Sequence, residues 1–484
     1  MHILQDLEPA KVFAYFEKIC SIPHTSFHEK QLSDYCVAFA KEHNLYYEQD
    51  EMGNVLIVAD ATPGYEDVPA VMLQGHLDMV GDKTAKCNLD LEKDGLKLYI
   101  DGDYIRAKGT TLGADDGIAV AYALTILDDS SIPHPRLEVV LTVCEEVGLL
   151  GATAMDLSSC KARRLINVDS EVEGILTAGC AGGIRVCSEL PVTRTLRSGI
   201  VTNFTLEGLM GGHSGIEIHK GRANSNVLLG RFLLQLNHRV DYDLIAIQGG
   251  TKENVIPKTG SISLLIKEND IKATYEVMNE FTTQMSAEYG TADPGIHLIM
   301  KQKNETPVER SVIDKDSLSR ILAALNTMPN GVQAMSMDLP GLVETSLNLG
   351  VISLSEDTFT MRFSIRSSVP SAKEYITSKV TYLTQMLGGW VSFSGEYPAW
   401  SYERESQFRD ICVSLYKKQY GKEPKIELMH AGLECGIIAD KLSGIDCISF
   451  GPNLIDVHTP NEHMSISSVS RVWEFLKAIL AYRE

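Results

Sequence analysis

The sequence predicts an α/β protein with a mostly parallel sheet and flanking helices, interrupted by an inserted α+β lid domain. Three observations predict this class. Buried apolar strands alternate with helical segments over the first 190 residues, as they do in βαβ units. From about Pro191 the strands alternate between apolar and polar residues, which is typical of half-exposed antiparallel strands. From Tyr402 the helical pattern of the first part resumes, so one domain is split by an insertion.

These changes divide the 484 residues into three segments. Residues 1–190 and 397–484 are predicted to form the two parts of one domain, and residues 191–396 the inserted domain. A faint internal repeat relates the segment from Asn254 (Asn-Val-Ile-Pro) to the segment from Asn348 (Asn-Leu-Gly-Val), because each is followed by a strand and then a helix. The insertion is therefore predicted to consist of two similar α+β halves.

The N-terminal part begins with two amphipathic helices at residues 7–19 and 26–43. Ser26 and Glu29 have the spacing of a capping box, which predicts that the second helix begins at this pair. Strands are predicted at residues 46–51, 54–59, 137–143 and 164–168, with the end of a buried strand at 71–73 and an apolar helix at 118–127.

The remaining elements follow from the same periodicities. The insertion is predicted to contain strands at 201–207, 261–267 and 358–365 and helices at 226–237, 271–285, 315–327 and 372–387. The C-terminal part is predicted to contain a helix at 407–419, strands at 425–429 and near 449–458, and a closing helix at 465–482.

The composition disfavours several classes of partner and location. The net charge of −20, from 64 acidic and 44 basic residues, disfavours nucleic acid and anionic membranes as partners. The N-terminus lacks the pattern of a signal peptide, and no apolar run reaches 18 residues, so no membrane span is expected. The 10 cysteines form no CxxC pair and are predicted to be reduced, mostly buried thiols of a cytoplasmic protein.

Histidines and carboxylates follow the strands of the split domain. Because parallel strands present their carboxyl ends at one edge, these side chains are expected to converge there. They are His76 and Asp78, Asp115 and Asp116, Glu145 and Glu146, Asp169, and His458. Several anions together are costly unless cations neutralise them. Mixed nitrogen and oxygen ligands suit Zn²⁺, Co²⁺ or Mn²⁺ better than Ca²⁺ or Mg²⁺, and two metals about 3.5–4 Å apart are plausible.

The adjacent pair Glu145-Glu146 follows a buried strand. Consecutive residues cannot both face one metal from a regular strand, so one can bind metal while the other faces a water molecule. A carboxylate in that position is a general base for hydrolysis. The alternative, two solvated glutamates at a helix start, fits the position of this pair less well.

Five motifs carry a resemblance to a known family. In order they are GHLDMV, GADDG, CEEVG, VDS and VHTPNE. Together they resemble the co-catalytic zinc peptidase family that includes aminoacylases, carnosinases and desuccinylases, and the resemblance spans both domains. It implies two zinc ions and hydrolysis by metal-activated water.

The resemblance also implies a role for each residue of the motifs. His76 with Asp169 and Glu146 with His458 would bind separate metals, bridged by Asp115, while Asp78 would orient His76 and Glu145 would be the base. His213, in Gly211-Gly212-His213-Ser214-Gly215, would stabilise the tetrahedral intermediate. Asn254 would contact substrate, and Arg366 would bind the substrate carboxylate. Without the resemblance, His213 would be interpreted as a surface residue and Arg366 as an exposed strand charge.

A final candidate is Glu434, in the glycine-rich turn Ala431-Gly432-Leu433-Glu434-Cys435-Gly436. It could bind the free amino group of a dipeptide. The function expected is a dinuclear metal-dependent dipeptidase acting on small peptides, including those with C-terminal His, and dimers are possible as in other family members. The alternatives are an N-acyl amino acid deacylase of the same fold and a catalytically silent metal-binding module.

Overall fold

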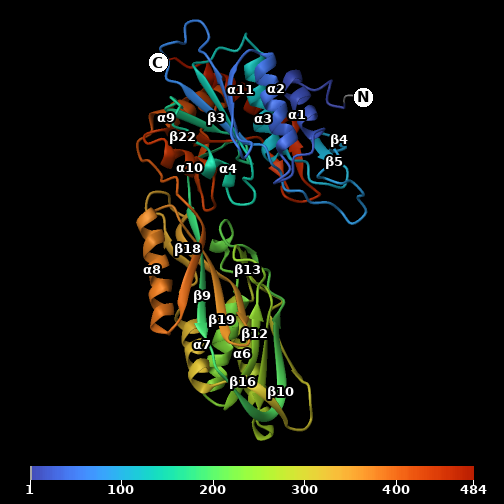
Figure 1. The fold of residues 1–484 in the computed structure, drawn as a ribbon, viewed down its shortest axis with the longest axis vertical. Coiled ribbons are helices and arrows are strands. Elements are labelled where there is room, and N and C mark those ends of the chain that lie inside the picture. The colour runs from blue at the N-terminus through green and yellow to red at the C-terminus, as the bar shows by residue number, and fades with distance from the viewer. Residues whose placement is uncertain (1–2, 484) are drawn as a thin grey trace. The chain divides into compact units, whose positions relative to one another are not determined.

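The computed structural model describes residues 3–483, which form two compact units (Figure 1). The first unit comprises Met1–Cys180, Trp400–Met429 and Leu433–Glu484, so both ends of the chain contribute to it. The second comprises Ala181–Ala399 and the short segment His430–Gly432. The second unit begins before residue 191 because its strand β9 (Gly182–Pro191) already pairs within the second sheet.

The first unit contains a sheet of eight strands, a smaller sheet of four, and seven helices. Its helices are α1 (Ala10–Cys20), α2 (Lys30–Glu42), α3 (Ala114–Asp128), α4 (Leu150–Ala154), α9 (Gln407–Tyr420), α10 (Glu434–Lys441) and α11 (Ile466–Leu480). Its strands are β1 (Tyr46–Gln49), β2 (Val55–Ala59), β3 (Val71–His76), β4 (Leu98–Asp101), β5 (Tyr104–Ala107), β6 (Leu137–Thr142), β7 (Arg164–Asn167), β8 (Ile175–Cys180), β21 (Lys425–Met429), β22 (Asp446–Ser449), β23 (Leu454–Ile455) and β24 (His463–Ser465).

The strand order of the large sheet places β3 between β6 and β7, parallel to both. The full order is β1-β2-β6-β3-β7-β22-β8-β21. Strand β22 runs parallel to β7 and β21 parallel to β8, while β1, β2 and β6 pair antiparallel at one side. The expected α/β class is confirmed, and the carboxyl ends of β3, β6 and β7 lie at one edge.

Alternate residues of β3 pack into two hydrophobic clusters, one on each face of the sheet. Val71 and Leu73 belong to a cluster that contains apolar residues of α1, α2, α3, α9 and α11. Met72 belongs to another that contains Cys435 and Ile438 of α10. This alternation follows from the two-residue period of a strand, and it makes the unit a sheet between two helical layers.

One local prediction about the first unit is wrong. Helix α2 begins at Lys30, and Glu29 at its N-cap makes no capping hydrogen bond with its side chain. Ser26 and Glu29 therefore do not form the expected capping box, and both side chains reach other parts of the unit. The cysteine prediction is confirmed, since all 10 are free thiols and all except Cys87 and Cys187 are buried.

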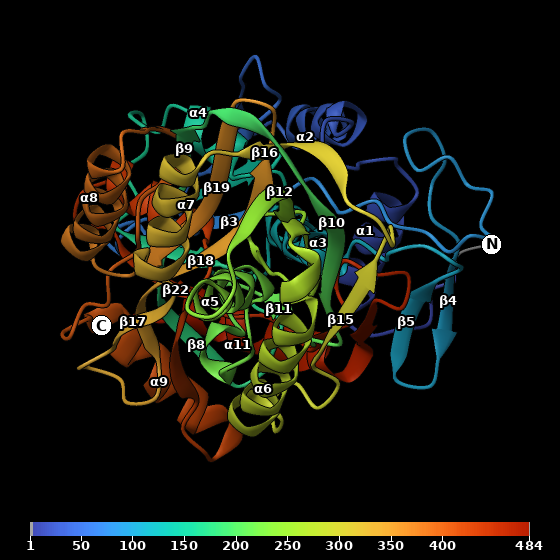
Figure 2. The ribbon, with the colours of Figure 1, turned by 90° about the horizontal axis from the view of Figure 1, so that it is seen from below.

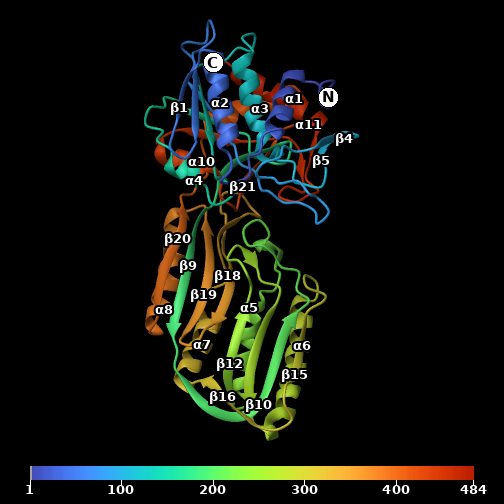
Figure 3. The ribbon, with the colours of Figure 1, turned by 45° about the vertical axis from the view of Figure 1, so that its right-hand side comes forward.

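The second unit is built on one long antiparallel sheet that four helices cover (Figures 2 and 3). The strands of this long sheet are β9, β10 (Arg194–Glu207), β12 (Tyr242–Gly249), β14 (Gly260–Ile266), β15 (His297–Gln302), β16 (Val308–Ile313), β17 (Gly331–Met335), β18 (Val343–Leu354), β19 (Thr358–Ser367) and β20 (Trp390–Tyr397). The short strands β11 (Gly212–His213) and β13 (Val255–Ile256) pair with each other in a separate sheet. The α-helices of the unit are α5 (Ser225–Asn237), α6 (Ile271–Tyr289), α7 (Lys315–Thr327) and α8 (Pro370–Met386), and it has 3-10 turns at Ile218–Lys220 and Glu268–Asp270.

Apolar residues of all four α-helices and of the sheet form one hydrophobic cluster in this unit. Helix α6 follows the strands β12–β14, and α8 follows β18–β19. The similarity of these two halves stays a prediction. Within residues 3–483, no helix has both the length and the apolar character needed to cross a membrane.

Candidate functional site

His76 is the last residue of the central strand β3, and its imidazole is almost completely buried. Its Nδ1 lies 2.9 Å from the carbonyl oxygen of Asp78 and 3.6 Å from that residue's carboxylate. Its Nε2 lies 3.0 Å from Asp115 Oδ1 and 3.8 Å from Asp169 Oδ1. Since the backbone carbonyl accepts a hydrogen bond from Nδ1–H, Nε2 is the nitrogen available to a ligand.

Asp115 lies between two imidazoles. Its Oδ1 faces His76 at 3.0 Å, and its Oδ2 faces His458 Nε2 at 3.1 Å. The residue is in the first turn of α3 but has a non-helical backbone, which turns its carboxylate toward the strand ends. Burial alone would raise the pKa of Asp115, but the hydrogen bonds to His458 and His76 hold it below the usual value. One carboxylate with an imidazole at each oxygen has the arrangement of a bridging ligand.

Glu145 and Glu146 lie in the turn that follows β6. Glu146 Oε1 is 2.8 Å from His458 Nε2, and the ligand atoms of Asp115, Glu146 and His458 lie within 4.8 Å of one another. Those of His76, Glu145 and Glu146 also lie within 4.8 Å. The carboxylate of Asp78 accepts hydrogen bonds from the backbone N–H groups of Glu145 (2.9 Å) and Glu146 (3.2 Å). Asp78 thus fixes the backbone of this turn.

We call the following residues the carboxylate cluster: His76, Asp115, Glu145, Glu146, Asp169 and His458. Burial, followed by the charges of neighbouring carboxylates, raises the pKa values of Glu145 and Asp169 well above their ordinary values, with His76 acting in the opposite direction. His458 would lose basicity by burial, but hydrogen bonds to Asp115 and Glu146 raise its pKa to about 11. Four carboxylates and two imidazoles gathered around the buried His76, with His458 at the exposed side, would be stabilised by bound cations. Their nitrogen and oxygen donors fit divalent transition metals.

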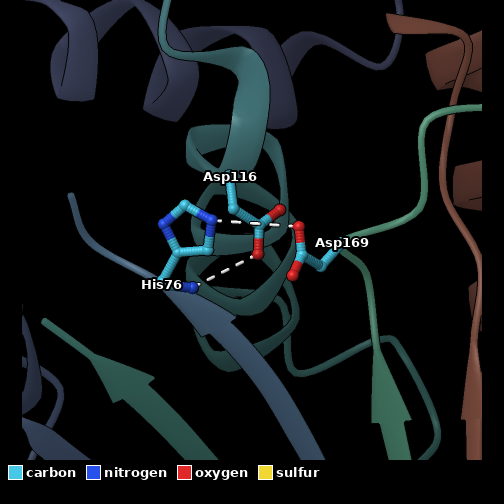
Figure 4. Close-up of side chains that lie close together, drawn as sticks. All are labelled: His76, Asp116 and Asp169. Atoms are coloured by element: carbon cyan, nitrogen blue, oxygen red, sulfur yellow. Dashed lines mark hydrogen bonds and ion pairs between the residues drawn. The ribbon is translucent and has the colours of Figure 1, made fainter. Parts of the chain in front are cut away.

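Asp116 is a member of this site that the sequence analysis expected near the other ligands but to which it assigned no role. Figure 4 shows it beside His76 and Asp169, and the ligand atoms of the three lie within 4.8 Å of one another. Its Oδ2 accepts a hydrogen bond from the backbone N–H of His76 at 3.2 Å, and its buried Oδ1 has no hydrogen-bond partner among residues 3–483. The adjacent pair Asp115-Asp116 was the available signal, but the pattern could not say which member faces the histidines.

Glu434, the first residue of α10, is completely buried. Its Oε2 accepts a hydrogen bond from Thr142 Oγ1 (2.6 Å), at the end of β6, and another from Gln74 Nε2, two residues before His76. Its buried Oε1 has no hydrogen-bond partner in the described part of the chain. Burial is the main cause that raises the pKa of Glu434 to about 7. This carboxylate therefore lies beneath the same strand ends as the carboxylate cluster.

His213 and Asn254 lie together in the second unit. Strands β11 and β13 pair so that His213 is opposite Val255, the residue after Asn254. The backbone N–H groups of Gly215 and Ile216 both donate to His213 Nδ1, each at 3.2 Å. The preceding Gly212 has φ of +142°, and a Cβ there would lie 2.3 Å from Arg222 Nη1, so only glycine fits. The loop fixes the orientation of the His213 imidazole.

Arg366 lies on β19 and is 9% exposed. Its Nη1 donates to the hydroxyl of Tyr397 at 2.7 Å, while Nε has no hydrogen-bond partner in the described residues. The facing residue on β18, Ser346, forms a hydrogen bond of 2.7 Å with His430 Nε2. A Cβ on Gly215 would lie 3.2 Å from Arg366 Nε, 3.0 Å from His213 Cε1 and 2.4 Å from the His430 carbonyl oxygen. The side chains of His213 and Arg366 and the backbone of His430 therefore surround Gly215.

His430, in the second unit, is a residue that the sequence analysis did not identify. Burial first, and then the Arg366 charge, lower the pKa of His430 to about 3, so its imidazole is neutral. Its Nδ1 and the hydroxyl of Ser214 are buried without a partner among the described residues, as is Arg366 Nε. If Ser346 donates to Nε2, the neutral ring carries its proton on Nδ1 as a donor. We call Ser214, Arg366 and His430 the donor cluster.

Comparisons with known proteins show the family and the fold of this chain. The model of peptidase family M20/M25/M40 matches residues 72–482. The cytosol non-specific dipeptidase of Escherichia coli (strain K12) is 38% identical over 482 residues, 99% of each chain. The crystal structure of the aminoacylhistidine dipeptidase of Vibrio alginolyticus is 38% identical, with a TM-score of 0.89 over 99% of this chain and 97% of that one. A more distant aminopeptidase from Bacillus cereus, 15% identical with a TM-score of 0.54 over 98% of each chain, shares the fold.

Proposed function

The chain belongs to peptidase family M20/M25/M40, and we propose that it is a metallo-dipeptidase whose metal centre is the carboxylate cluster. The observation that carries this proposal is the Asp115 carboxylate, with His76 at one oxygen and His458 at the other. An anion shared by two imidazoles, with further carboxylates around both, is the donor arrangement that two neighbouring divalent cations require.

We assign the ligands by their distances. His76 and Asp169, 3.8 Å apart, would hold one cation, and Glu146 and His458, 2.8 Å apart, would hold the other, with Asp115 shared. Zn²⁺ suits this mixture of imidazole and carboxylate, and Co²⁺ or Mn²⁺ would also fit. When bound, the cations would polarise the peptide carbonyl and make water more acidic.

Glu145 is the proposed general base. Its carboxylate lies within 4.8 Å of the ligand atoms of His76 and Glu146, and Asp78 holds its backbone. We propose that it removes a proton from the attacking water and then delivers that proton to the leaving amine. His213, whose Nδ1 accepts two backbone hydrogen bonds, carries its ring proton on Nε2 and is proposed to stabilise the oxyanion.

The ends of a dipeptide have opposite charges, and the chain offers a complementary group for each. The donor cluster suits the C-terminal carboxylate, because the Arg366 guanidinium and the neutral His430 ring both have an unpartnered nitrogen. The unpartnered oxygen of Glu434 suits the free amino group. Asn254 is proposed to contact the substrate backbone beside His213.

The names of the relatives support finer proposals. We propose that the substrates include dipeptides with C-terminal His, as the name of the Vibrio alginolyticus enzyme indicates for that protein. The name of the Escherichia coli relative supports a cytoplasmic location. We also propose that the segment 191–396 acts as a substrate-binding insertion between catalytic segments 1–190 and 397–484, and that the chain forms a homodimer. The net charge of −20 argues against nucleic acid and anionic membranes as partners.

The direct test compares Ala-His with N-acetyl-His after metal removal and re-addition of Zn²⁺, Co²⁺ or Mn²⁺. A dipeptidase that recognises the free amino group cleaves Ala-His and leaves N-acetyl-His intact. Cleavage of N-acetyl-His alone would identify a deacylase on the same fold, and no cleavage of either compound would indicate a silent metal-binding protein.

A further inference from the structure

The turn that carries Glu145 and Glu146 is held by an unusual set of contacts. It begins at Cys144, a non-glycine residue with a left-handed backbone of φ +53°. Three successive backbone N–H groups in this turn donate to buried carboxylates. Those of Glu145 and Glu146 donate to Asp78, and that of Cys144 donates to Glu29 Oε1 at 3.0 Å. The direction of both catalytic-site glutamates therefore depends on these two carboxylates.

Glu29 comes from the loop between α1 and α2, more than a hundred residues earlier in the chain. Its side chain is 5% exposed, and Oε1 also accepts hydrogen bonds from the Phe27 backbone N–H (3.0 Å) and the Cys144 thiol (3.3 Å). Phe27 has a left-handed backbone as well, with φ +69°. One carboxylate oxygen thus ties together two backbone positions that non-glycine residues adopt only at a cost.

The same loop supports the other carboxylate. Ser26 Oγ donates to Asp78 Oδ2 at 2.8 Å, and the Met79 backbone N–H donates to the His24 carbonyl oxygen at 3.1 Å. The loop is therefore bonded both to the segment after His76 and to the turn of Glu145. Helix capping does not explain these side chains, because neither caps α2.

We propose that Glu29 is a positioning residue that sets the backbone of Cys144, and through it the directions of Glu145 and Glu146. A polar group buried at this depth is costly unless it is hydrogen-bonded, and Glu29 Oε1 accepts three hydrogen bonds. Its reach, more than its charge, places this acceptor oxygen at Cys144. The bonds hold consecutive glutamates in a non-helical turn, so that one side chain can reach a cation while the other faces water. This inference rests on the proposed roles of Glu145 and Glu146.

The test uses two conservative variants with opposite changes. Glu29→Asp keeps the charge but withdraws the carboxylate by one methylene, so it loses contact with Cys144. Glu29→Gln loses the charge but keeps an oxygen at the same reach. Glu138→Asp is the matched control, because Glu138 is a buried carboxylate of the same unit that accepts the backbone N–H groups of Lys161 and Ala162 at 2.8–2.9 Å.

We expect Glu29→Asp to lower kcat for Ala-His by about 10- to 100-fold, because small misplacements of reacting groups have effects of this size. KM should change by less than about threefold. Affinity for Co²⁺, measured by competition with a chelator, should fall by about 10- to 100-fold, as when residues that support metal ligands are changed. Glu29→Gln should retain kcat and Co²⁺ affinity within about threefold, and Glu138→Asp should leave both unchanged at a comparable loss of thermal stability.

The proposal fails if Glu29→Asp keeps both kcat and Co²⁺ affinity, if Glu29→Gln is damaged as badly as Glu29→Asp, or if Glu138→Asp lowers both quantities equally. The Co²⁺ measurement separates this proposal from the dipeptidase assignment. If the unchanged protein cleaves no dipeptide, the assignment of function fails, while the difference in Co²⁺ affinity between the two Glu29 variants still decides the role of Glu29.

Discussion

The two units of this protein present clusters of opposite chemical character. The carboxylate cluster of the first unit gathers four anionic side chains around two imidazoles, from the ends of three parallel strands, the start of α3 and the segment after β23. The donor cluster of the second unit gathers a guanidinium, a neutral imidazole and a hydroxyl around a glycine-rich loop. The first has the chemistry to bind cations, and the second has the chemistry to bind an anion.

The clusters also differ in which buried polar atoms have no partner among the described residues. In the first unit the turns that carry ligands are held by carboxylates that accept backbone N–H groups, as Glu29 does for Cys144. The unpartnered atoms there are carboxylate oxygens, Asp116 Oδ1 and Glu434 Oε1, whereas in the second unit they are the nitrogens Arg366 Nε and His430 Nδ1. Because unsatisfied buried polar groups are costly, they indicate where a ligand completes the structure.

The largest effect expected from this difference follows metal removal. Dialysis against a chelator should reduce dipeptidase activity to the uncatalysed level, and re-addition of Zn²⁺, Co²⁺ or Mn²⁺ should restore it. Because the four carboxylates then repel one another, thermal unfolding should also occur at a lower temperature without metal. Full activity after removal, verified by metal analysis, would contradict a metal centre at the carboxylate cluster.

Substitution of Glu145 should separate catalysis from metal binding. We expect Glu145→Gln to lower kcat by about 10²- to 10⁴-fold, the usual range for loss of a general base, with Zn²⁺ affinity nearly unchanged. The neighbour provides the control, since Glu146→Gln should weaken Zn²⁺ binding, measured by competition with a chelator. Full activity of Glu145→Gln would remove the proposed mechanism.

Substitution of Arg366 tests whether the second unit binds the substrate carboxylate. Arg366→Ala should raise KM for Ala-His by about 10- to 100-fold, the equivalent of a charge-assisted hydrogen bond, with a much smaller effect on Ala-His amide, which has no carboxylate. Arg362→Ala is the matched control, because Arg362 lies on the same strand with its side chain half exposed. If Arg366→Ala raises KM equally for Ala-His and for Ala-His amide, Arg366 does not recognise the substrate carboxylate.

Part of the carboxylate cluster was predictable because parallel strands deliver their ends to one edge. His76 ends β3, Glu145 and Glu146 follow β6, and Asp169 follows β7. The expectation was wrong for Asp115, which lies at the start of α3, and for His458, which follows β23 of the small antiparallel sheet. The resemblance of their motifs, and not the order of the strands, singled out these two residues. The fold class followed from the change in strand pattern after the first domain. The start of the insertion was placed later than the start of the second unit, because β9 already belongs to the second sheet.

The features that sequence patterns did not predict depend on contacts between segments that are distant in the sequence. Ser26 and Glu29 match a capping box locally, but their partners Asp78 and Cys144 lie far along the chain and outweigh the local pattern. His430 had no signal of its own, because a single histidine before a glycine turn is indistinguishable from a surface residue. Its environment depends on Ser346 and Arg366, which are neighbours only after β18 and β19 pair.

The last prediction concerns His430 and its effect on stability, not on turnover. Its pKa falls from the ordinary 6.5 to about 3 on folding, so the unfolded chain binds a proton more readily than the folded one between these pH values. The neutral ring thus contributes stability that is present above pH 6.5 and is lost as pH falls toward 3. In His430→Gln, this loss of roughly 2–4 kcal/mol in the free energy of unfolding should disappear, as measured by urea denaturation of metal-loaded protein across this range.

His297 supplies a control with the opposite sign. It is exposed, and its hydrogen bonds with the Gly295 carbonyl oxygen and Glu207 raise its pKa, so its contribution is present below pH 6.5 and is lost as pH rises. Below pH 6.5, His297→Gln should therefore have a slightly lower free energy of unfolding than the unchanged protein, whereas His430→Gln should have a higher one. If both variants respond to pH in the same direction, His430 is not held neutral in the folded protein, and its Nδ1 proton cannot be assigned to recognition of an anion.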